Sequence, residues 1–428
     1  MIKVLLDYAK LNNLATYISD KEIKQIGEMI YKKTGLGSDF LGWLDWAENY
    51  LNDKEYTELK LKAEQIKKQV EVCLVIGIGG SYLGARAADN MINGLHNKNN
   101  VEMIYIGNTM SATYLAQIKD YVKDKKFSII NISKSGTTVE PSISFRIFEE
   151  LLINQIGQEN AKELIIAITD KSKGALFTLA KSKGYKSFVI PDNIGGRFSV
   201  LTPVGLLPLA ISGVNTDQVL LGAIKAQKKL ADISLNNEAI KYAVARYLLH
   251  TKYNFKVEAL VSYEMQMQLM CEWWKQLFGE SEGKENKGLL PFSMIFSTDL
   301  HSLGQFVQEG TKNILFETII DIKKPTLDLL IPKTVDNLDN LNYLTDKTIN
   351  EINHVALKGV LQAHADSANI PNIILEFESM NDLQFGYAVY FFELAVAYSG
   401  YLLGINPFNQ PGVEIYKKNM FKLLGKPQ

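Results

Sequence analysis

From residue 72 onward, short runs of β-branched and aliphatic residues alternate with helical patterns, and this alternation constrains the fold most. In the first half the runs cover residues 72–78, 101–106, 127–132, 163–168 and 187–190. Strands that alternate with helical segments favour a parallel, doubly wound sheet with right-handed crossovers. Ligands bind to such a sheet outside the carboxyl ends of its strands. The loops that follow these strands are therefore the places to look for a site.

The second half repeats the alternation less regularly, with expected strands at residues 259–262, 292–296, 315–322 and 373–378. A chain of 428 residues is long enough for more than one hydrophobic core. We therefore predict an α/β protein with two doubly wound, mainly parallel sheets, each flanked by helices in three layers. Its parts would be a helical N-terminal segment packing on the core (1–70), a first α/β domain (71–200) and a second with a C-terminal catalytic helix (201–428). Residues 323–350 are expected to form an excursion over the surface.

Charge and cysteine content narrow the possible functions. The chain has 46 Lys and Arg against 47 Asp and Glu, and no basic stripe is interleaved with aromatic residues, which argues against nucleic acid as a partner. Cys73 and Cys271 lie in apolar surroundings and show neither zinc spacing nor a disulfide framework. We expect two buried thiols and a cytoplasmic protein.

Neither end of the chain predicts a membrane segment. The N-terminus lacks the pattern of a signal peptide. The apolar segment 385–405 contains Glu393 and three glycines and has no basic flanks. We expect a buried helix there rather than a membrane span.

The loop after the first expected strand is rich in glycine, Gly77-Ile-Gly-Gly-Ser-Tyr-Leu-Gly84. Tyr82 stands where a dinucleotide fingerprint requires glycine, so this motif is absent. The glycines would let backbone N–H groups approach an anion at a helix N-terminus, with the Ser81 hydroxyl beside them. A tight turn needed only for packing explains the same loop.

Four hydroxyls and a lysine follow the third expected strand, in Ser133-Lys-Ser-Gly-Thr-Thr138. Neutral donors at a strand-to-helix turn suit a compact dianion such as a phosphate monoester. A helix N-cap needs only one hydroxyl, so a phosphate site is favoured.

After the fifth strand, Gly195-Gly-Arg197 can turn sharply and hold a permanent charge near a site. An exposed loop arginine is the alternative.

Two later segments carry residues suited to proton transfer. Glu280 lies in a glycine-flanked loop, Gly279 to Lys284, and His301 follows an apolar strand just inside a new helix. Carboxylate and imidazole can both be tuned to exchange protons near neutral pH, although a solvated charged loop explains the same residues. Lys417 stands in the first turns of a C-terminal helix, where the dipole disfavours a cation. It is either functional or one more surface lysine.

Four of these stretches, residues 77–84, 195–199, 279–284 and 409–417, together resemble the glucose-6-phosphate isomerase (phosphoglucose isomerase) family in its shorter bacterial form. The Ser133 to Thr138 loop is similar to the phosphate loop of sugar-isomerase (SIS) domains generally. The resemblance extends over nearly the whole chain, in the family's order. It implies a cytoplasmic enzyme of glycolysis and gluconeogenesis. That enzyme would interconvert glucose 6-phosphate and fructose 6-phosphate through a cis-enediol, without metal or cofactor.

The resemblance also implies roles for single residues. Glu280 would move the proton between C1 and C2, and Arg197 would stabilise the enediolate. His301 and Lys417 match the ring-opening pair, with the histidine donated by the neighbouring subunit of a homodimer. The other matches are substrate contacts: Ser133, Lys134, Ser135 and Thr138 in the phosphate clamp, with Gly80, Ser81, Gln276 and Gln410 beyond it.

Two alternatives stay open. Another isomerase of this architecture would act on mannose 6-phosphate or on an aminosugar phosphate; a glutamine-hydrolysing synthase is excluded because no amidotransferase segment with an N-terminal cysteine is present. A non-catalytic sugar-phosphate sensor would keep the hydroxyl loop but could lose Glu280, His301 or Lys417. This chain has all three, and no helix-turn-helix extension is evident.

Overall fold

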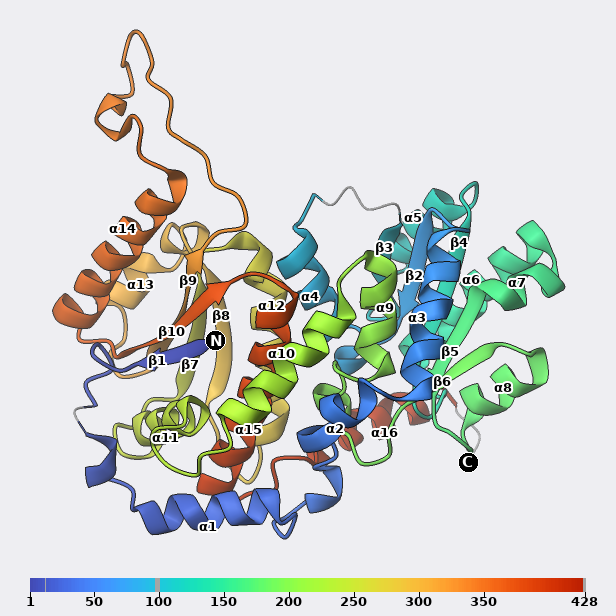
Figure 1. Ribbon diagram of the computed structural model, residues 1–428, viewed down its shortest axis with the longest axis horizontal. Helices are drawn as coiled ribbons and strands as arrows, with labels where there is room; N and C mark the ends of the chain where they lie inside the picture. The colour runs from blue at the N-terminus through green and yellow to red at the C-terminus, as the bar shows by residue number, and fades with distance from the viewer. Residues whose placement is uncertain (12, 97–100, 426–428) are drawn as a thin grey trace.

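The computed structural model describes residues 1–11, 13–96 and 101–425, and its two five-stranded sheets occupy two lobes (Figure 1). The first sheet has the order β3-β2-β4-β5-β6, and its strands all pair in parallel. The strands are β2 (Val72–Ile76), β3 (Glu102–Ile106), β4 (Phe127–Ile132), β5 (Ile165–Thr169) and β6 (Lys186–Val189). All five strands expected in the first half are confirmed, and none of their ends differs from the expected one by more than two residues.

The second sheet has the order β1-β10-β9-β7-β8. Its strands are β1 (Ile2–Leu5), β7 (Val257–Ser262), β8 (Leu290–Ile295), β9 (Leu315–Lys324) and β10 (Asn372–Ser379). The four strands expected in the second half are confirmed, and they pair in parallel. The expectation that the N-terminal segment is wholly helical was wrong, because β1 pairs antiparallel with β10 at the sheet edge. Four residues are too few to show a strand period against the helical patterns that follow.

The helices cover both faces of each sheet, as expected for a three-layer α/β protein. In chain order they are α1 (Asp20–Tyr31), α2 (Trp43–Tyr50), α3 (Lys54–Lys67), α4 (Leu83–Asn93), α5 (Ala112–Val122), α6 (Val139–Ile156), α7 (Gln158–Leu164), α8 (Ala175–Lys183), α9 (Pro203–Ser212), α10 (Thr216–Lys229), α11 (Glu238–Thr251), α12 (Gln268–Glu282), α13 (Gly304–Glu309), α14 (Ile349–Leu361), α15 (Asp382–Leu402) and α16 (Glu414–Leu423). Of these, α10, α12 and α15 lie between the two sheets (Figure 1).

Side-chain alternation along the strands divides the interior into three clusters. In β2, Cys73 and Val75 face a core shared by both lobes, whereas Val72 and Leu74 face an outer core beneath α5 and α6. A third cluster lies on the outer face of the second sheet, against α13 and α14. Because successive side chains of a strand point to opposite faces, both sheets are buried on two sides. Their strands therefore read as continuous apolar runs.

The apolar segment 385–405 forms most of α15, and every side chain from residue 384 to residue 401 is buried. A helix that is apolar on all sides belongs inside a large protein or a membrane, and here it lies between the sheets. Within the described ranges, no helix is both long and apolar enough to traverse a bilayer. Cys73 and Cys271 are buried free thiols, as expected.

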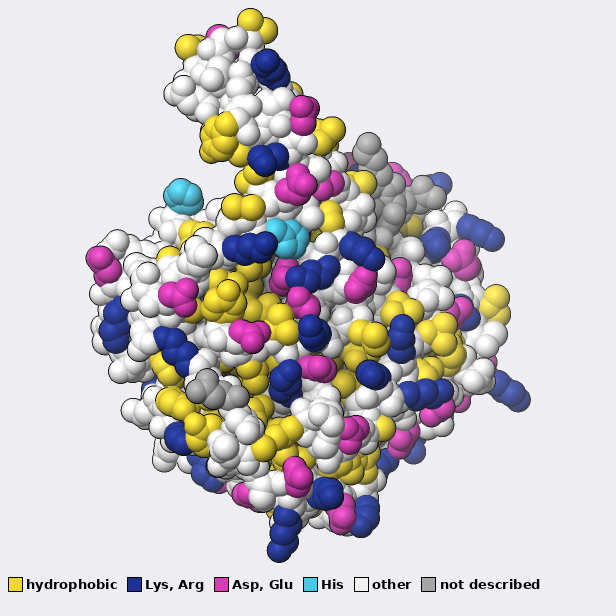
Figure 2. Space-filling view, turned by 60° about the vertical axis from the view of Figure 1, so that its left-hand side comes forward, with side chains coloured by type: hydrophobic (Ala, Val, Ile, Leu, Met, Phe, Trp, Pro, Cys, Tyr) yellow, Lys and Arg dark blue, Asp and Glu magenta, His cyan; other side chains and the backbone are white. Residues whose placement is uncertain are grey.

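Residues 325–348, here called the arm, connect β9 to α14. The arm projects away from the body of the molecule (Figures 1 and 2) instead of running over its surface as expected. A bridge between Leu330 and Thr348 closes its base, and the Asn342 side chain bonds both backbone groups of Thr334. Its large apolar side chains are exposed: Leu327, Leu329, Leu330, Val335, Leu338, Leu341 and Tyr343.

Candidate active site

A cleft of about 440 Å³ opens at the carboxyl end of the first sheet. The strand order reverses between β2 and β4, and the loops after these two strands form one wall, as expected at a topological switch point. The opposite wall comes from α12 and α16. Eight of the predicted site residues line the cleft: Gly80, Ser135, Thr138, Arg197, Gln276, Glu280, Gln410 and Lys417. The other four, Ser81, Ser133, Lys134 and His301, do not.

The glycine loop after β2 comes very close to the segment that carries Arg197. A Cβ atom on Gly80 would lie 2.0 Å from the carbonyl oxygen of Gly196, a distance that no side chain permits. Glycine is therefore required at position 80 for the two backbones to meet. This contact brings the first lobe's loops against the arginine segment.

Three hydroxyl side chains of the loop after β4 face the cleft. Thr138 is the N-cap of α6, yet its side chain makes no capping hydrogen bond. The Ser135 hydroxyl accepts from the backbone N–H of Thr137 and from the Thr137 hydroxyl, at 3.2 and 3.1 Å. These three side chains line the cleft. More hydroxyl groups face the cleft than the cap of α6 requires.

Two predicted clamp residues support this loop from behind. Ser133 is buried, and its hydroxyl accepts from the backbone N–H of Gly136 at 3.0 Å. The Lys134 ammonium lies 3.0 Å from an Asp192 carboxyl oxygen. Neither side chain faces the cleft.

Arg197 is only 2% exposed, so it is not an exposed loop arginine. Its Nε donates to the Ser281 hydroxyl at 2.8 Å, and Nη1 donates to Gln410 Oε1 at 2.8 Å and to Glu280 Oε2 at 3.3 Å. Its Nη2 donates to the carbonyls of Pro407 and Asn409. Burial lowers the pKa of Arg197 to about 10, with Glu280 opposing that effect. The guanidinium thus stays charged at neutral pH.

Glu280 lies in the last turn of α12 and not in a loop, which corrects the interpretation of its flanking glycines. Gly279 is inside the helix, where a Cβ atom would come within 3.2 Å of Pro291. One turn earlier, Gln276 donates to Glu280 Oε1 at 3.0 Å. The carboxylate is thus held between an amide and a guanidinium, with 32% of its side chain exposed to the cleft.

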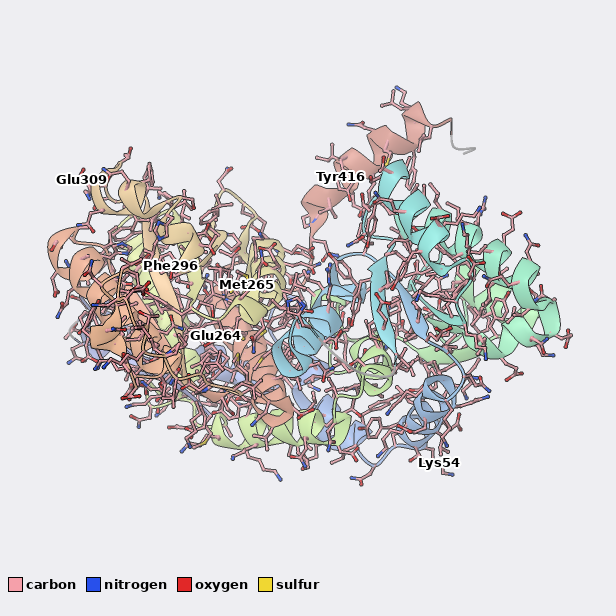
Figure 3. The ribbon with its side chains drawn as sticks, turned by 90° about the horizontal axis from the view of Figure 1, so that it is seen from above. Lys54, Glu264, Met265, Phe296, Glu309 and Tyr416 are labelled. Carbon is pink, nitrogen blue, oxygen red and sulfur yellow. The ribbon has the colours of Figure 1, made fainter. Side chains whose placement is uncertain are left out.

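Lys417 and His301 are placed differently. Lys417 lies in the first turns of α16, 2.9 Å from Glu414, and lines the cleft. His301 is exposed at the end of a short 3₁₀ helix in the second lobe, Thr298–Leu300. Phe296, just before this helix, lies away from Tyr416 of α16 (Figure 3). Glu280 and Lys417 thus line the cleft of this chain, whereas His301 lies outside it.

Sequence reasoning missed several residues that shape the cleft. Ser281 holds the Nε of Arg197, and Glu140 and Tyr416 line the cleft. Lys284 donates to three oxygens of Asn406 and Asn409. Ser281 and Lys284 lie inside the Gly279 to Lys284 motif, so the motif itself was the available signal.

Across residues 1–11, 13–96 and 101–425, His, Cys, Asp and Glu side chains do not gather in groups of three or more that could hold a metal ion. The glycine loop after β2 carries Tyr82 in place of the third glycine of a dinucleotide fingerprint.

Several known proteins are similar to this chain over its full length. A glucose-6-phosphate isomerase of Mycoplasma capricolum subsp. capricolum is 62% identical over 428 residues, covering 100% of this chain and 99% of that protein. A glucose-6-phosphate isomerase of Staphylococcus haemolyticus is 49% identical over 434 residues, covering 100% of this chain and 97% of that protein.

Solved structures share the fold. A hypothetical protein from Thermus thermophilus superposes with a TM-score of 0.89 at 26% identity, covering 99% of this chain and 100% of that one. A glucose-6-phosphate isomerase from Chlamydia trachomatis superposes with a TM-score of 0.81 at 19% identity, covering 99% and 88%. Residues 60–427 match the profile described as phosphoglucose isomerase. With this match and its full-length relatives, the chain belongs to the phosphoglucose isomerase family.

Proposed function

We propose that this protein interconverts glucose 6-phosphate and fructose 6-phosphate. The observation that carries the proposal is the cleft itself, in which a carboxylate, a buried arginine and a lysine face a loop of hydroxyl groups, in a chain that belongs to this family throughout. Isomerising an aldose phosphate to a ketose phosphate requires a base, a fixed positive charge and an anchor for a dianion. The cleft contains one candidate for each requirement.

Glu280 is the base that moves the proton between C2 and C1. Gln276 and Arg197 hold its two oxygens at 3.0 and 3.3 Å, which leaves the carboxylate in one orientation. Arg197 lies beside the same reacting carbons and stabilises the negative charge that develops on the enediolate oxygen. Because its guanidinium is already held by five acceptors, it does not reorganise during the reaction.

The hydroxyls of Ser135, Thr137 and Thr138 hold the substrate phosphate. They stand where α6 begins, and positive helix-dipole ends with free donors favour phosphate groups. Ser133 and Lys134 shape this loop from outside the cleft, through Gly136 and Asp192. Gln410 and the backbone at Gly80 contact the sugar between phosphate and base.

The enzyme acts as a homodimer in the cytoplasm, and the neighbouring subunit supplies His301 to the ring-opening step with Lys417. Two observations support the dimer. His301 is exposed and outside its own chain's cleft. The arm projects from the body of the molecule and exposes seven large apolar side chains, which contact with a second copy would remove from water. A hollow of about 860 Å³ at the base of the arm continues to Ser297 and Thr298, beside the His301 loop.

The test is formation of glucose 6-phosphate from fructose 6-phosphate, with a chelator present, by wild type and by Glu280→Gln. The variant should lose about 10³- to 10⁴-fold in kcat, as expected for a general base, and should bind the substrate within about tenfold of wild type. Glu285→Gln is the matched control, because Glu285 is an exposed carboxylate on the following loop, 3.5 Å from Lys287.

Normal turnover in Glu280→Gln would remove this residue from the mechanism. An inactive wild type would direct the assay to mannose 6-phosphate and aminosugar phosphates. Binding of sugar phosphates without turnover of any would support the sensor hypothesis instead.

A further inference from the structure

Lys284 lies two residues beyond the end of α12 and reaches across to a distant part of the chain. Its ammonium donates to the carbonyl oxygen of Asn406 at 2.7 Å, to the carbonyl oxygen of Asn409 at 2.5 Å and to Asn409 Oδ1 at 2.9 Å. An ammonium has three N–H donors, so the side chain's capacity is used entirely on this one segment.

Arg197 also holds this segment. The Asn409 carbonyl accepts from both Lys284 and Arg197, and the neighbouring Pro407 carbonyl accepts from Arg197 at 2.8 Å. Residues 406–410 thus accept hydrogen bonds from two cations. Their carbonyl groups replace the water that each cation loses on burial.

Beyond this segment the chain enters α16, which forms one wall of the cleft. No side chain of α16 is buried, although Tyr416 and Lys417 line the cleft. Its least exposed side chains, Lys417, Met420 and Phe421, are only partly buried, and ten residues are too few to hold a helix in place alone. The position of Lys417 therefore depends on where residues 406–410 are held.

We propose that Lys284 is a positioning residue that ties residues 406–410 to the end of α12 and so holds α16, with Lys417, against the cleft. The inference rests on the proposed function for the reaction that it serves. Lys284 is not among the residues that line the cleft. It acts through the segment that carries Gln410 and leads to Lys417.

The charge of Lys284 makes this contact sensitive to pH. Burial, and after it the charge of Arg197, lowers the pKa of Lys284 to about 8. Glu285 and Glu280 also face the ammonium and oppose the shift, whereas residues 406–410 offer it only carbonyl and amide oxygens. Raising the pH through this range removes the charge and weakens the three bonds, because charge-assisted hydrogen bonds are about twice as strong as neutral ones.

The experiment compares wild type with Lys284→Met, Lys284→Arg and Lys287→Met. Lys284→Met keeps the apolar stem without the charge, and Lys284→Arg keeps a charge that does not titrate. Lys287→Met is the control, because Lys287 lies on the same loop with Glu285 as its partner, at 3.5 Å. Hydrogen exchange is measured for residues 403–425, together with kcat and KM for fructose 6-phosphate between about pH 6 and 9.5.

We expect Lys284→Met to exchange about tenfold faster within residues 406–425 and to lose about tenfold in kcat, with KM within about threefold. Lys284→Arg should keep most of kcat and lose the alkaline decline of wild type. Wild-type exchange in Lys284→Met would overturn the proposal, and so would faster exchange with unchanged kcat. A wild type without isomerase activity would refute the proposed function alone, because the exchange measurement does not depend on turnover.

Discussion

Two buried arginines bind the last turn of α12. Arg197 is 2% exposed and Arg246 is 1% exposed. Arg197 donates to the Ser281 hydroxyl at 2.8 Å, and Arg246 donates to both carboxyl oxygens of Glu282, at 2.6 and 3.2 Å. Neighbouring residues of one helix thus bind two guanidinium groups with nearly equal burial.

The two arginines differ in the charge of their partners. Arg246 contacts two buried carboxylates, Glu258 and Glu282, and the Ser399 hydroxyl. Arg197 contacts four neutral oxygens and one carboxylate, Glu280, at a distance of 3.3 Å. The first set holds one positive charge against two negative charges, whereas the second holds one against one partly exposed carboxylate.

This difference separates a structural arginine from one that can act on a substrate. Burial works against the charge of Arg246, but Glu258 and Glu282 outweigh it and raise the pKa of Arg246 above its usual range. Burial lowers the pKa of Arg197 to about 10, because only Glu280 opposes it. Because four of its five hydrogen-bond partners are neutral, Arg197 can stabilise a negative charge that forms nearby. An arginine whose charge is fully matched contributes to the fold only.

Replacing Arg197 by lysine is the most severe test of this distinction. Lysine cannot reproduce a fork that reaches five acceptors, so kcat/KM should fall about 10³-fold, or about 4 kcal/mol in the transition state. The free energy of unfolding should fall by only about 1–2 kcal/mol, since a charged donor remains among neutral acceptors. Steady-state kinetics and urea unfolding of one preparation give both numbers. Equal losses in stability and activation free energy would mean that both arginines are structural.

Replacing Arg246 by methionine should have the opposite result. Glu258 and Glu282 would be left buried without their cation, which costs about 3–5 kcal/mol of unfolding free energy. In the absence of urea, kcat per folded molecule should stay within about threefold of wild type. Glu282→Gln provides a milder variant if Arg246→Met does not fold, with a loss of about 1–3 kcal/mol. A large drop in kcat at unchanged stability would break the comparison.

Glu393 shows what a buried carboxyl does without an arginine beside it. It lies in the middle of α15, fully buried, and neither of its oxygens has a hydrogen-bond partner in the described part of the chain. Burial raises the pKa of Glu393 well above 4.5. The folded state therefore keeps a proton that the unfolded chain releases above pH 4.5, so this residue lowers stability as pH rises.

Glu393→Gln should remove that pH dependence. The contribution of Glu393 to the unfolding free energy has a limiting slope of about −1.4 kcal/mol per pH unit above about pH 4.5. We expect urea unfolding at several pH values between about 5 and 8 to show that the unfolding free energy of the variant rises relative to that of wild type as the pH increases. Parallel curves would mean that the carboxyl of Glu393 is ionised in the folded state and finds a partner there.

Local patterns predicted most of the secondary structure and misjudged two places in it. The nine strands expected after residue 70 are present because buried parallel strands leave continuous apolar runs in the sequence. β1 was missed because its four residues are stabilised by pairing with β10, about 370 residues later in the chain. Glu280 was expected in a loop because glycine commonly interrupts a helix. Gly279 instead lies inside α12, where it packs closely against Pro291 of β8.

The sequence alone determined which chemical groups this protein has and in what order. Runs of apolar residues, the Ser133 to Thr138 hydroxyls and the motif residues Arg197, Glu280 and Lys417 are all visible there. The tertiary structure decided which of these groups meet, and that His301 stays outside the cleft of its own chain. It also decided that the partners of Arg197 are mainly neutral, whereas Arg246 contacts two buried carboxylates. Hydrogen bonds and charge pairs act over about 3–4 Å through space, whereas a sequence pattern registers only neighbours along the chain.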